Sequence, residues 1–210
     1  MEALTDGVFA IVMTLLVLEL AVDTSVITTD EDLMSGLSHM WGGIFTYIMT
    51  FIALGAFWLI HRYQFNFIRH ADGVAIWLNI FFLTTVAIYP FTNSLLSYMG
   101  GASIVIFSAN AIISNIILFV FWWYASSEHR LLKPNTSPQI IKLIKILPIP
   151  AIVGMPIASV VALLISYEAS IFILFFLLAF YVFLTASWSH KIRLIEVGCT
   201  KGAESESDSE

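Results

Sequence analysis

Charged residues are scarce in this chain of 210 residues, of which 11% are Asp, Glu, Lys or Arg while 59% are hydrophobic. Soluble domains usually contain about a quarter charged residues and about half apolar ones. A soluble fold of this length has no interior large enough for so much apolar surface. The mean hydropathy of +0.91 therefore predicts that much of this surface contacts lipid.

Cysteine and the common catalytic motifs are also nearly absent. Cys199 is alone, which excludes an intrachain disulfide and a cysteine-based metal cluster. The chain contains no HExxH, GxSxG or Walker A motif, and its five histidines lack the spacing of a metal site on one helix. We expect no enzyme activity, no cofactor and no small-molecule substrate. The sequence also lacks a basic stripe that would bind nucleic acid.

Six apolar runs approach the length of about 20 residues that a helix needs to cross a bilayer. They cover residues 4–22, 38–60, 73–95, 101–124, 143–166 and 168–188. The third run contains Pro90 and the fifth contains Pro148, Pro150 and Pro156, so both should kink or begin irregularly. The predicted fold class is an all-α membrane protein with six transmembrane helices per subunit.

These six helices form one predicted transmembrane domain over residues 1–190. Residues 191–210 end in an acidic, polar stretch with nothing apolar to bury, which predicts a disordered tail.

Basic residues are missing from three of the predicted connections. All nine lysines and arginines cluster around the second-to-third connection, the fourth-to-fifth connection and the end of the sixth run. With six spans these regions share one side, which the positive-inside rule makes cytoplasmic. Both termini are then cytoplasmic, whereas five or seven spans would scatter the basic residues over both sides.

The opposite connections carry only acidic charges, namely Asp23, Asp30, Glu31, Asp32 and Glu168. Acidic groups at the mouth of a pore raise the local concentration of cations. The alternative is that these connections are simply free of positive charge, and the sequence leaves both readings open.

The TVGYG filter of classical potassium channels is absent, so selectivity in a channel of this sequence must come from side chains. On a wheel of about 100° per residue, Ile11, Leu15 and Leu18 form one stripe on the first helix. Thr14 flanks the stripe, and Asp6 lies on nearly the opposite side. The stripe is either a helix–helix seam or the lining of a path, and Thr14 alternatively bonds the carbonyl of residue 10.

The start of this helix, Leu4-Thr5-Asp6-Gly7-Val8 followed by an apolar run, resembles the signature of the transmembrane protein 175 family. This family comprises endosomal and lysosomal potassium channels and their prokaryotic relatives. Residues 57–62, 77–79 and 89–92 resemble its second and third helices. The family triplet Phe-Ser-Asp is here Leu4-Thr5-Asp6, and the family's preceding arginine falls before Met1.

The resemblance implies a prokaryotic homotetramer in the cell membrane, with potassium as the permeant ion and the first helices around a central pore. It assigns the pore constriction, or gate, to Ile11 with further apolar rings at Leu15 and Leu18. It assigns selectivity to Thr14. Thr5 and Asp6 then tie helices together away from the pore.

Three residues at the expected depth of Asp6 are possible partners for it, namely His61, Trp77 and Asn79. The alternative for these three is ordinary bonding at helix ends and in an interfacial belt.

Two other classes remain as alternatives. A secondary transporter, proton- or cation-coupled, usually has a titratable group near the bilayer midplane and paired broken helices. The sequence offers acids only near the ends of the first helix, Asp6 and Glu19, and one proline-rich span. A structural membrane protein without transport would leave the acidic connections and the apolar stripe unexplained.

The six-span topology predicts where cysteines react with an impermeant thiol reagent. In sealed right-side-out vesicles, His129→Cys and the tail, which already holds Cys199, should be protected, because both lie inside. Asp30→Cys should react from outside. External labelling of the tail would overturn the six-span topology.

Overall fold

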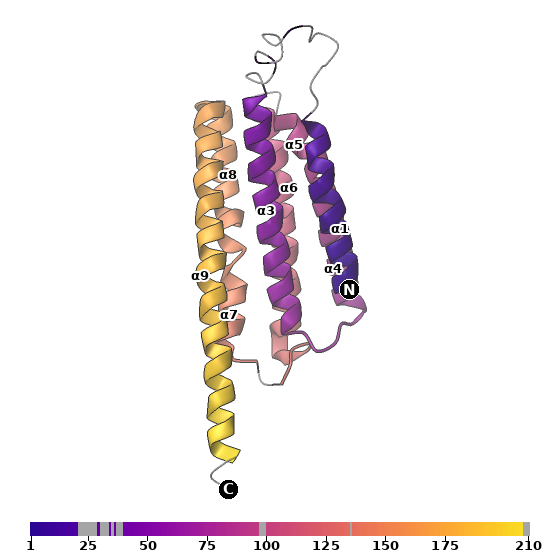
Figure 1. The fold of residues 1–210 in the computed structure, drawn as a ribbon, viewed down its shortest axis with the longest axis vertical. Helices are drawn as coiled ribbons and strands as arrows, with labels where there is room; N and C mark the ends of the chain where they lie inside the picture. Colours follow the sequence, from indigo (N-terminus) through magenta and orange to yellow (C-terminus); the bar gives the residue numbers. More distant parts are fainter. Residues whose placement is uncertain are drawn as a thin grey trace.

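The computed structural model describes residues 1–20, 29, 34, 36, 40–96, 100–134 and 136–207. Its helices, labelled as in Figure 1, stand side by side as an elongated bundle. They are α1 (Glu2–Leu15), η1 (Leu16–Glu19), α3 (Trp41–Asn66), α4 (Gly73–Ala87), α5 (Tyr89–Leu96), α6 (Gly101–Ser126), η2 (Ser127–His129), α7 (Pro138–Ile146), α8 (Ile149–Leu164) and α9 (Tyr167–Ser207).

Five helical stretches are long and apolar enough to cross a membrane. They are Trp41–Asn66, Gly73–Leu96, Gly101–Ser126, Pro138–Leu164 and Tyr167–Trp188. The first predicted span, residues 4–22, does not meet this criterion, because the 14 residues of α1 are followed by only four residues of 3-10 helix. At about 1.5 Å and about 2 Å per residue the two segments together reach about 29 Å, close to a hydrocarbon core of about 30 Å. The predicted all-helical membrane fold is confirmed.

Proline breaks the third and fifth spans, as predicted. The third span is interrupted at Ile88 between α4 and α5, because Pro90 has no N–H to donate to the preceding turn. Asn110 of α6 donates its Nδ2 to the carbonyl of Thr85 at 3.2 Å, so a side chain satisfies a carbonyl beside the break. The fifth span divides into α7 and α8. Pro156, by contrast, lies inside α8 without ending it.

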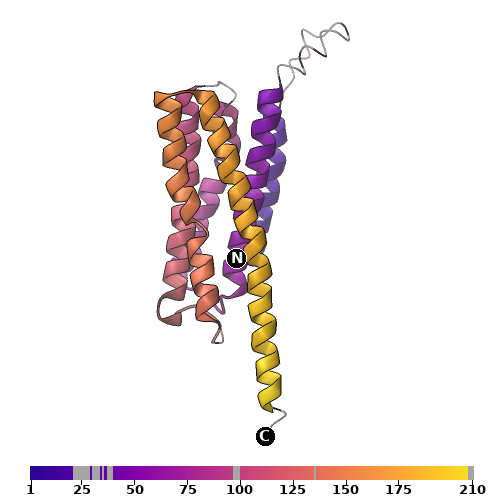
Figure 2. The same cartoon turned by 90° about the vertical axis from the view of Figure 1, so that its left-hand side faces the viewer.

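The helices form two groups around α3. Figure 1 shows α8 and α9 on one side of α3 and α1 with α4 on the other. Figure 2 shows that α9 lies beside α8 at one end of the bundle and crosses toward α3 further along. Helix α1 packs on α3 and α4, and η1 packs on α3 and α5. The main apolar core joins both groups through side chains such as Phe57, Phe82 and Leu174.

One end of the bundle carries the basic connections, and we call it the basic end. Two of these connections pair there through backbone bonds, from Arg69 N to the Leu131 carbonyl at 2.8 Å and from Lys133 N to the Phe67 carbonyl at 2.9 Å. Asp72 begins α4 by accepting from Ala75 N at 2.9 Å, and the Tyr124 hydroxyl donates to the same carboxylate. The bond from Tyr124, and then that from Ala75, lower the pKa of Asp72 below its usual range.

Both termini point toward the basic end in Figure 1, as an even number of spans requires. That this end faces the cytoplasm stays a prediction. Of the acidic residues on the opposite connections, Glu168 is exposed in the first turn of α9. Asp23, Asp30, Glu31 and Asp32 lie outside the described residues.

Helix α9 continues to Ser207, so residues 191–207 differ from the disordered tail that their composition predicts. A helix that is already formed extends without a new nucleation cost, and this stretch contains the helix formers Ala, Glu and Lys. The last three residues lie outside the described part. The domain boundary at residue 190 stays a prediction.

Candidate functional site

Helix α1 has one buried face and one uncovered face. Thr5, Phe9, Val12 and Leu16 recur at helical spacing and are buried against α3, α4 and α5. Their ring and branched side chains fill the groove between these helices. This packing sets the rotation of α1 about its own axis.

The uncovered face contains the predicted stripe. Ile11, Leu15 and Leu18 are exposed by 60%, 43% and 69%, and Leu4 lies on the same side. The stripe is therefore not a helix–helix seam within the subunit. Exposed apolar surface of this kind requires lipid or another protein against it.

Thr14 lies beside the stripe and is exposed. Its hydroxyl is within 3.0 Å of the Ala10 carbonyl and 2.7 Å of the Ile11 carbonyl, to which it donates. The alternative reading, a bond to its own helix at residue 10, is thus confirmed. Because the hydroxyl has a single proton, this bond leaves the oxygen lone pairs free on the exposed side.

A buried polar chain ties α1 to two other helices. Asn79 of α4 donates its Nδ2 to Thr5 Oγ1 at 3.4 Å, and its Oδ1 lies 2.7 Å from His61 Nε2 of α3. With the amide in this orientation, His61 must carry its proton on Nε2 and donate. The imidazole is stacked on Phe65 and Phe82, which hold the ring in place. Asn79 and His61, two of the predicted partners of Asp6, therefore form a hydrogen-bonded chain with Thr5 instead.

Asp6 bonds elsewhere. Trp58 of α3 donates its Nε1 to Asp6 Oδ1 at 2.7 Å, so the predicted hydrogen-bond partners His61, Trp77 and Asn79 were wrong for this residue. Trp77 is 60% exposed on α4. The reason is rotational, since Asp6 lies about 100° further round α1 than Thr5 and so faces the flank of α3.

The sequence contained one indication that Trp58 could contact Asp6. Trp58 precedes His61 by three residues, and residues three apart share one face of a helix. Arg62 stacks its guanidinium 5.2 Å from the Trp58 ring, which adds a positive charge close to the indole that binds Asp6. Among the described residues, no group of three His, Cys, Asp or Glu side chains is arranged to hold a metal ion.

Five helical stretches of membrane-spanning length and the shorter first segment, which buried polar bonds tie to α3 and α4, define a multi-span α-helical membrane protein in the part of the chain that the structure describes. A sequence model of the family described as "Endosomal/lysosomal potassium channel TMEM175" matches residues 1–90. A potassium channel of Chamaesiphon minutus is 33% identical over 140 residues, which cover 62% of this chain and 67% of that protein. A potassium channel of Streptomyces collinus is 25% identical over 142 residues, 65% of this chain and 68% of that protein. The chain belongs to the TMEM175 family.

Two solved structures share the fold. A crystal structure of a lysosomal potassium-selective channel TMEM175 homolog from Chamaesiphon minutus matches with a TM-score of 0.77, 22% identity and coverage of 88% of this chain and 95% of that one. A variant of the potassium channel MtTMEM175, in complex with a nanobody–MBP fusion protein, matches with a TM-score of 0.60, 18% identity and coverage of 91% and 92%. At these identities the likeness concerns the fold alone.

The Asp6–Trp58 bond should contribute to the stability of the subunit and not to ion selectivity. Asp6→Ala and Trp58→Phe each remove one partner, and a double-mutant cycle on thermal stability in detergent should give a coupling of about 1 kcal/mol. Glu19→Ala is the matched control, because it removes an exposed acid from the other end of the same helical segment. A coupling near zero, or a stable Asp6→Ala protein with altered ion selectivity, would contradict this role.

Proposed function

We propose that this chain is one subunit of a potassium channel whose pore is lined by α1. Membership of the TMEM175 family and the names of the relatives, which are potassium channels, support the ion and the activity. The observation that carries the pore assignment is the uncovered stripe of Ile11, Leu15 and Leu18. No catalytic role and no cofactor belong to the proposal, and potassium is the permeant ion.

The proposed assembly is a homotetramer in the plasma membrane of a prokaryote, with both termini in the cytoplasm. Four α1 helices surround the axis, each with its stripe turned inward. The buried chain from Thr5 to Asn79 and His61 supports this arrangement, because it holds the opposite face of α1 against its own subunit. The stripe is then free to face three other copies.

The gate in this proposal is a ring of four Ile11 side chains. A narrow apolar ring excludes water, and an ion cannot follow without its hydration shell, so conduction requires the ring to widen. Leu15 and Leu18 add further apolar rings. The 3-10 turn from Leu16 to Glu19 supports this alignment, because three residues per turn place Leu18 directly above Leu15.

Selectivity in this proposal comes from the cost of dehydration and from Thr14, since the chain has no TVGYG filter. Potassium releases water more readily than sodium does. The Thr14 hydroxyl donates its proton backward to carbonyls of its own helix, which leaves its oxygen as an acceptor on the stripe side. Four such oxygens can replace part of the shell of a cation.

A secondary transporter is the second candidate function, because α4–α5 and α7–α8 are both interrupted, and paired broken helices are typical of transporters. A coupled transporter usually has a titratable group near the bilayer midplane. In the part of the chain that the structure describes, no Asp, Glu, Lys or Arg side chain is buried, which argues against a transporter. Flux from purified protein in liposomes separates the two functions. A channel gives flux that needs no coupling ion, whereas a transporter gives saturable, coupled flux.

The gate assignment predicts that Ile11→Asn raises potassium flux. A polar ring stays hydrated, so the barrier should fall by at least about 1.4 kcal/mol, which is about tenfold in rate. Leu15→Asn and Leu18→Asn should act in the same direction more weakly. Conductance of single channels and the yield of tetramer are to be measured together.

The matched control for the gate is Val17→Asn, since Val17 is exposed on the same helical segment but outside the stripe. It should leave conductance unchanged. If the stripe instead packs against lipid or protein, Ile11→Asn should lower the yield or leave flux as it was. Normal yield with unchanged conductance would remove Ile11 from the pore.

The selectivity assignment predicts that Thr14→Val keeps potassium flux but lowers the preference for potassium over sodium. Valine has nearly the same shape and lacks the oxygen, so the expected loss is about fivefold, the equivalent of about 1 kcal/mol. Reversal potentials under bi-ionic conditions measure it. Thr84→Val is the control, because Thr84 is an exposed threonine on α4 that also bonds its own helix.

A further inference from the structure

Helix α7 is a short amphipathic helix at the basic end of the bundle. Ile140 and Ile144 are buried on one side of it, in an apolar cluster with Phe67 and Trp122. The Trp122 indole also donates to the Ile141 carbonyl at 3.0 Å, which joins the middle of α7 to α6. These contacts fix the rotation of α7, so the side opposite Ile140 and Ile144 faces away from the bundle.

The outward side of α7 carries two lysines. Lys142 is exposed and Lys145 is partly exposed. Residues three apart are neighbours on a helix surface, with about 5–6 Å between their Cβ atoms. Among the described residues, neither ammonium group has a hydrogen bond or an ion pair. The described part of the subunit therefore leaves both positive charges without a counter-charge.

An exposed apolar stripe begins beside these lysines and runs along α8. Its four branched side chains are exposed by between 40% and 57%, namely Ile146, Ile149, Val153 and Ile157. Leu147 and Pro148, between α7 and α8, keep right-handed helical dihedrals, so the helical spacing continues from one helix into the next. Lys142 precedes Ile146 by four residues, which places charge and stripe on one side. At about 1.5 Å per residue, the stripe is about 17 Å long.

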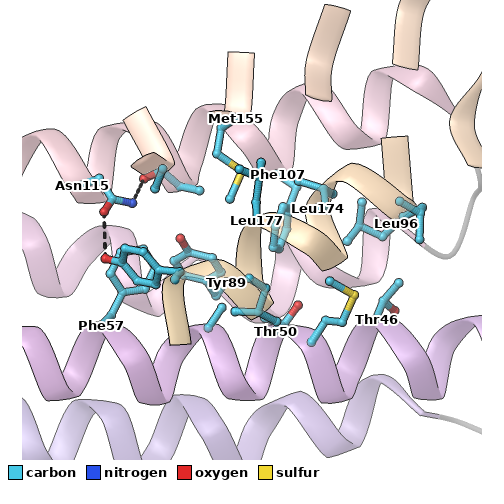
Figure 3. Close-up of a pocket in the computed structure, with 17 residues that line it drawn as sticks. Thr46, Thr50, Phe57, Tyr89, Leu96, Phe107, Asn115, Met155, Leu174 and Leu177 are labelled. Carbon is cyan, nitrogen blue, oxygen red and sulfur yellow. Dashed lines mark hydrogen bonds between the residues drawn. The ribbon is translucent and has the colours of Figure 1, made fainter. Parts of the chain in front are cut away.

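The other side of α8 belongs to the interior of the subunit. Figure 3 shows Met155 among the side chains that line a cavity between the helices, and Ala151 lines the same cavity. Ala158 is fully buried. Because this side already packs within its own subunit, the uncovered apolar stripe must contact lipid or another protein.

Helix α7 is placed at the depth of the lipid headgroups. The span from Pro138 to Leu164 has 27 residues, so at about 1.5 Å per residue it is about 40 Å long. This exceeds the hydrocarbon core of about 30 Å and reaches the thickness of about 40–45 Å that includes the headgroups. Trp123, the chain neighbour of the residue that bonds α7, is 54% exposed, as is typical of an interfacial tryptophan. The lysines then lie level with lipid phosphates, and the stripe lies along the acyl chains of one leaflet.

We propose that the outward side of α7 and α8 binds an anionic phospholipid, with Lys142 and Lys145 on the phosphate and the stripe along an acyl chain. Two uncompensated positive charges favour a lipid of net negative charge over a zwitterionic one, whose ammonium group they repel. A second copy of this chain fits less well. Copies in one membrane share one orientation, so the basic end of the second copy would lie at the same depth as these lysines.

The lipid site is separate from the proposed pore. Figure 1 shows α7 and α8 on one side of α3 and α1 on the other. Its test requires no ion flux, so it stands or falls independently of the channel proposal.

The experiment uses the full chain, purified in detergent and freed of lipid, and measures the binding of phosphatidylglycerol by native mass spectrometry. Lys142→Gln and Lys145→Gln should each raise the concentration for half-maximal binding about fivefold, the equivalent of about 1 kcal/mol per lysine. Phosphatidylcholine with the same acyl chains should bind about tenfold more weakly. In nanodiscs, a phosphatidylglycerol with a photoreactive diazirine in its acyl chain should label Ile149 and Val153.

The matched control is Lys133→Gln. Lys133 is an exposed lysine of the same end but outside α7, and its ammonium group donates to the Asn66 carbonyl at 2.6 Å. This variant should leave the binding of phosphatidylglycerol unchanged. A loss as large as that of the two α7 variants would show a general attraction to the basic end and overturn the site.

Two further results would contradict the lipid site. Glycerophosphoglycerol, the headgroup without acyl chains, should not compete, and competition at similar concentrations would show a site for soluble phosphates instead. Absence of the label from the stripe, with labelling of other exposed helices, would show that another protein surface covers it. Each variant should unfold at the same temperature as the unchanged chain, because both lysines of α7 lack partners within the described residues.

Discussion

The first helix faces the way its buried side dictates, where side-chain packing is accompanied by the hydrogen bond between Thr5 and Asn79. This bond joins α1 to α4, and the contact between Asn79 and His61 extends the tie to α3. Phe9, Val12 and Leu16 follow Thr5 along the same side and are buried with it. The side chains of a helix keep fixed angles around its axis. Because Thr5, Phe9, Val12 and Leu16 are buried, Ile11, Leu15 and Leu18 on the other side stay uncovered. Any pore that α1 lines therefore depends on the contacts made by its opposite, buried side.

The same requirement, that polar groups inside a bilayer find partners within the protein, accounts for the rest of the bundle. The break before Pro90 leaves backbone carbonyls to satisfy, and Asn110 donates to the one at Thr85. Ser114, one turn further along α6, donates to the hydroxyl of Thr85 at 2.8 Å. Helix α6 thus stabilises an interruption in its neighbour.

The two ends of the bundle are held in different ways. At the basic end, paired backbone segments and the Tyr124–Asp72 bond join two connections directly. At the opposite end, the Tyr167 hydroxyl of α9 donates to the Leu96 carbonyl at 2.8 Å, where α5 ends. Between these ends, apolar side chains pack together, and polar bonds such as Thr50–Asn93 and Tyr181–Asn115 join neighbouring helices.

The sequence by itself determined the membrane class and, with small shifts of their ends, five of the six spans, because the length and hydropathy of a segment are local properties. It also determined the proline breaks, because the missing N–H of proline acts locally. Helical periodicity also placed the stripe and Asp6 on different sides of α1. Only the tertiary structure decided that Asp6 binds Trp58 while Asn79 and His61 serve Thr5. Depth in the membrane follows from sequence position, but a hydrogen bond also depends on how neighbouring helices are rotated. That rotation is set by side-chain packing between segments that lie far apart in the chain.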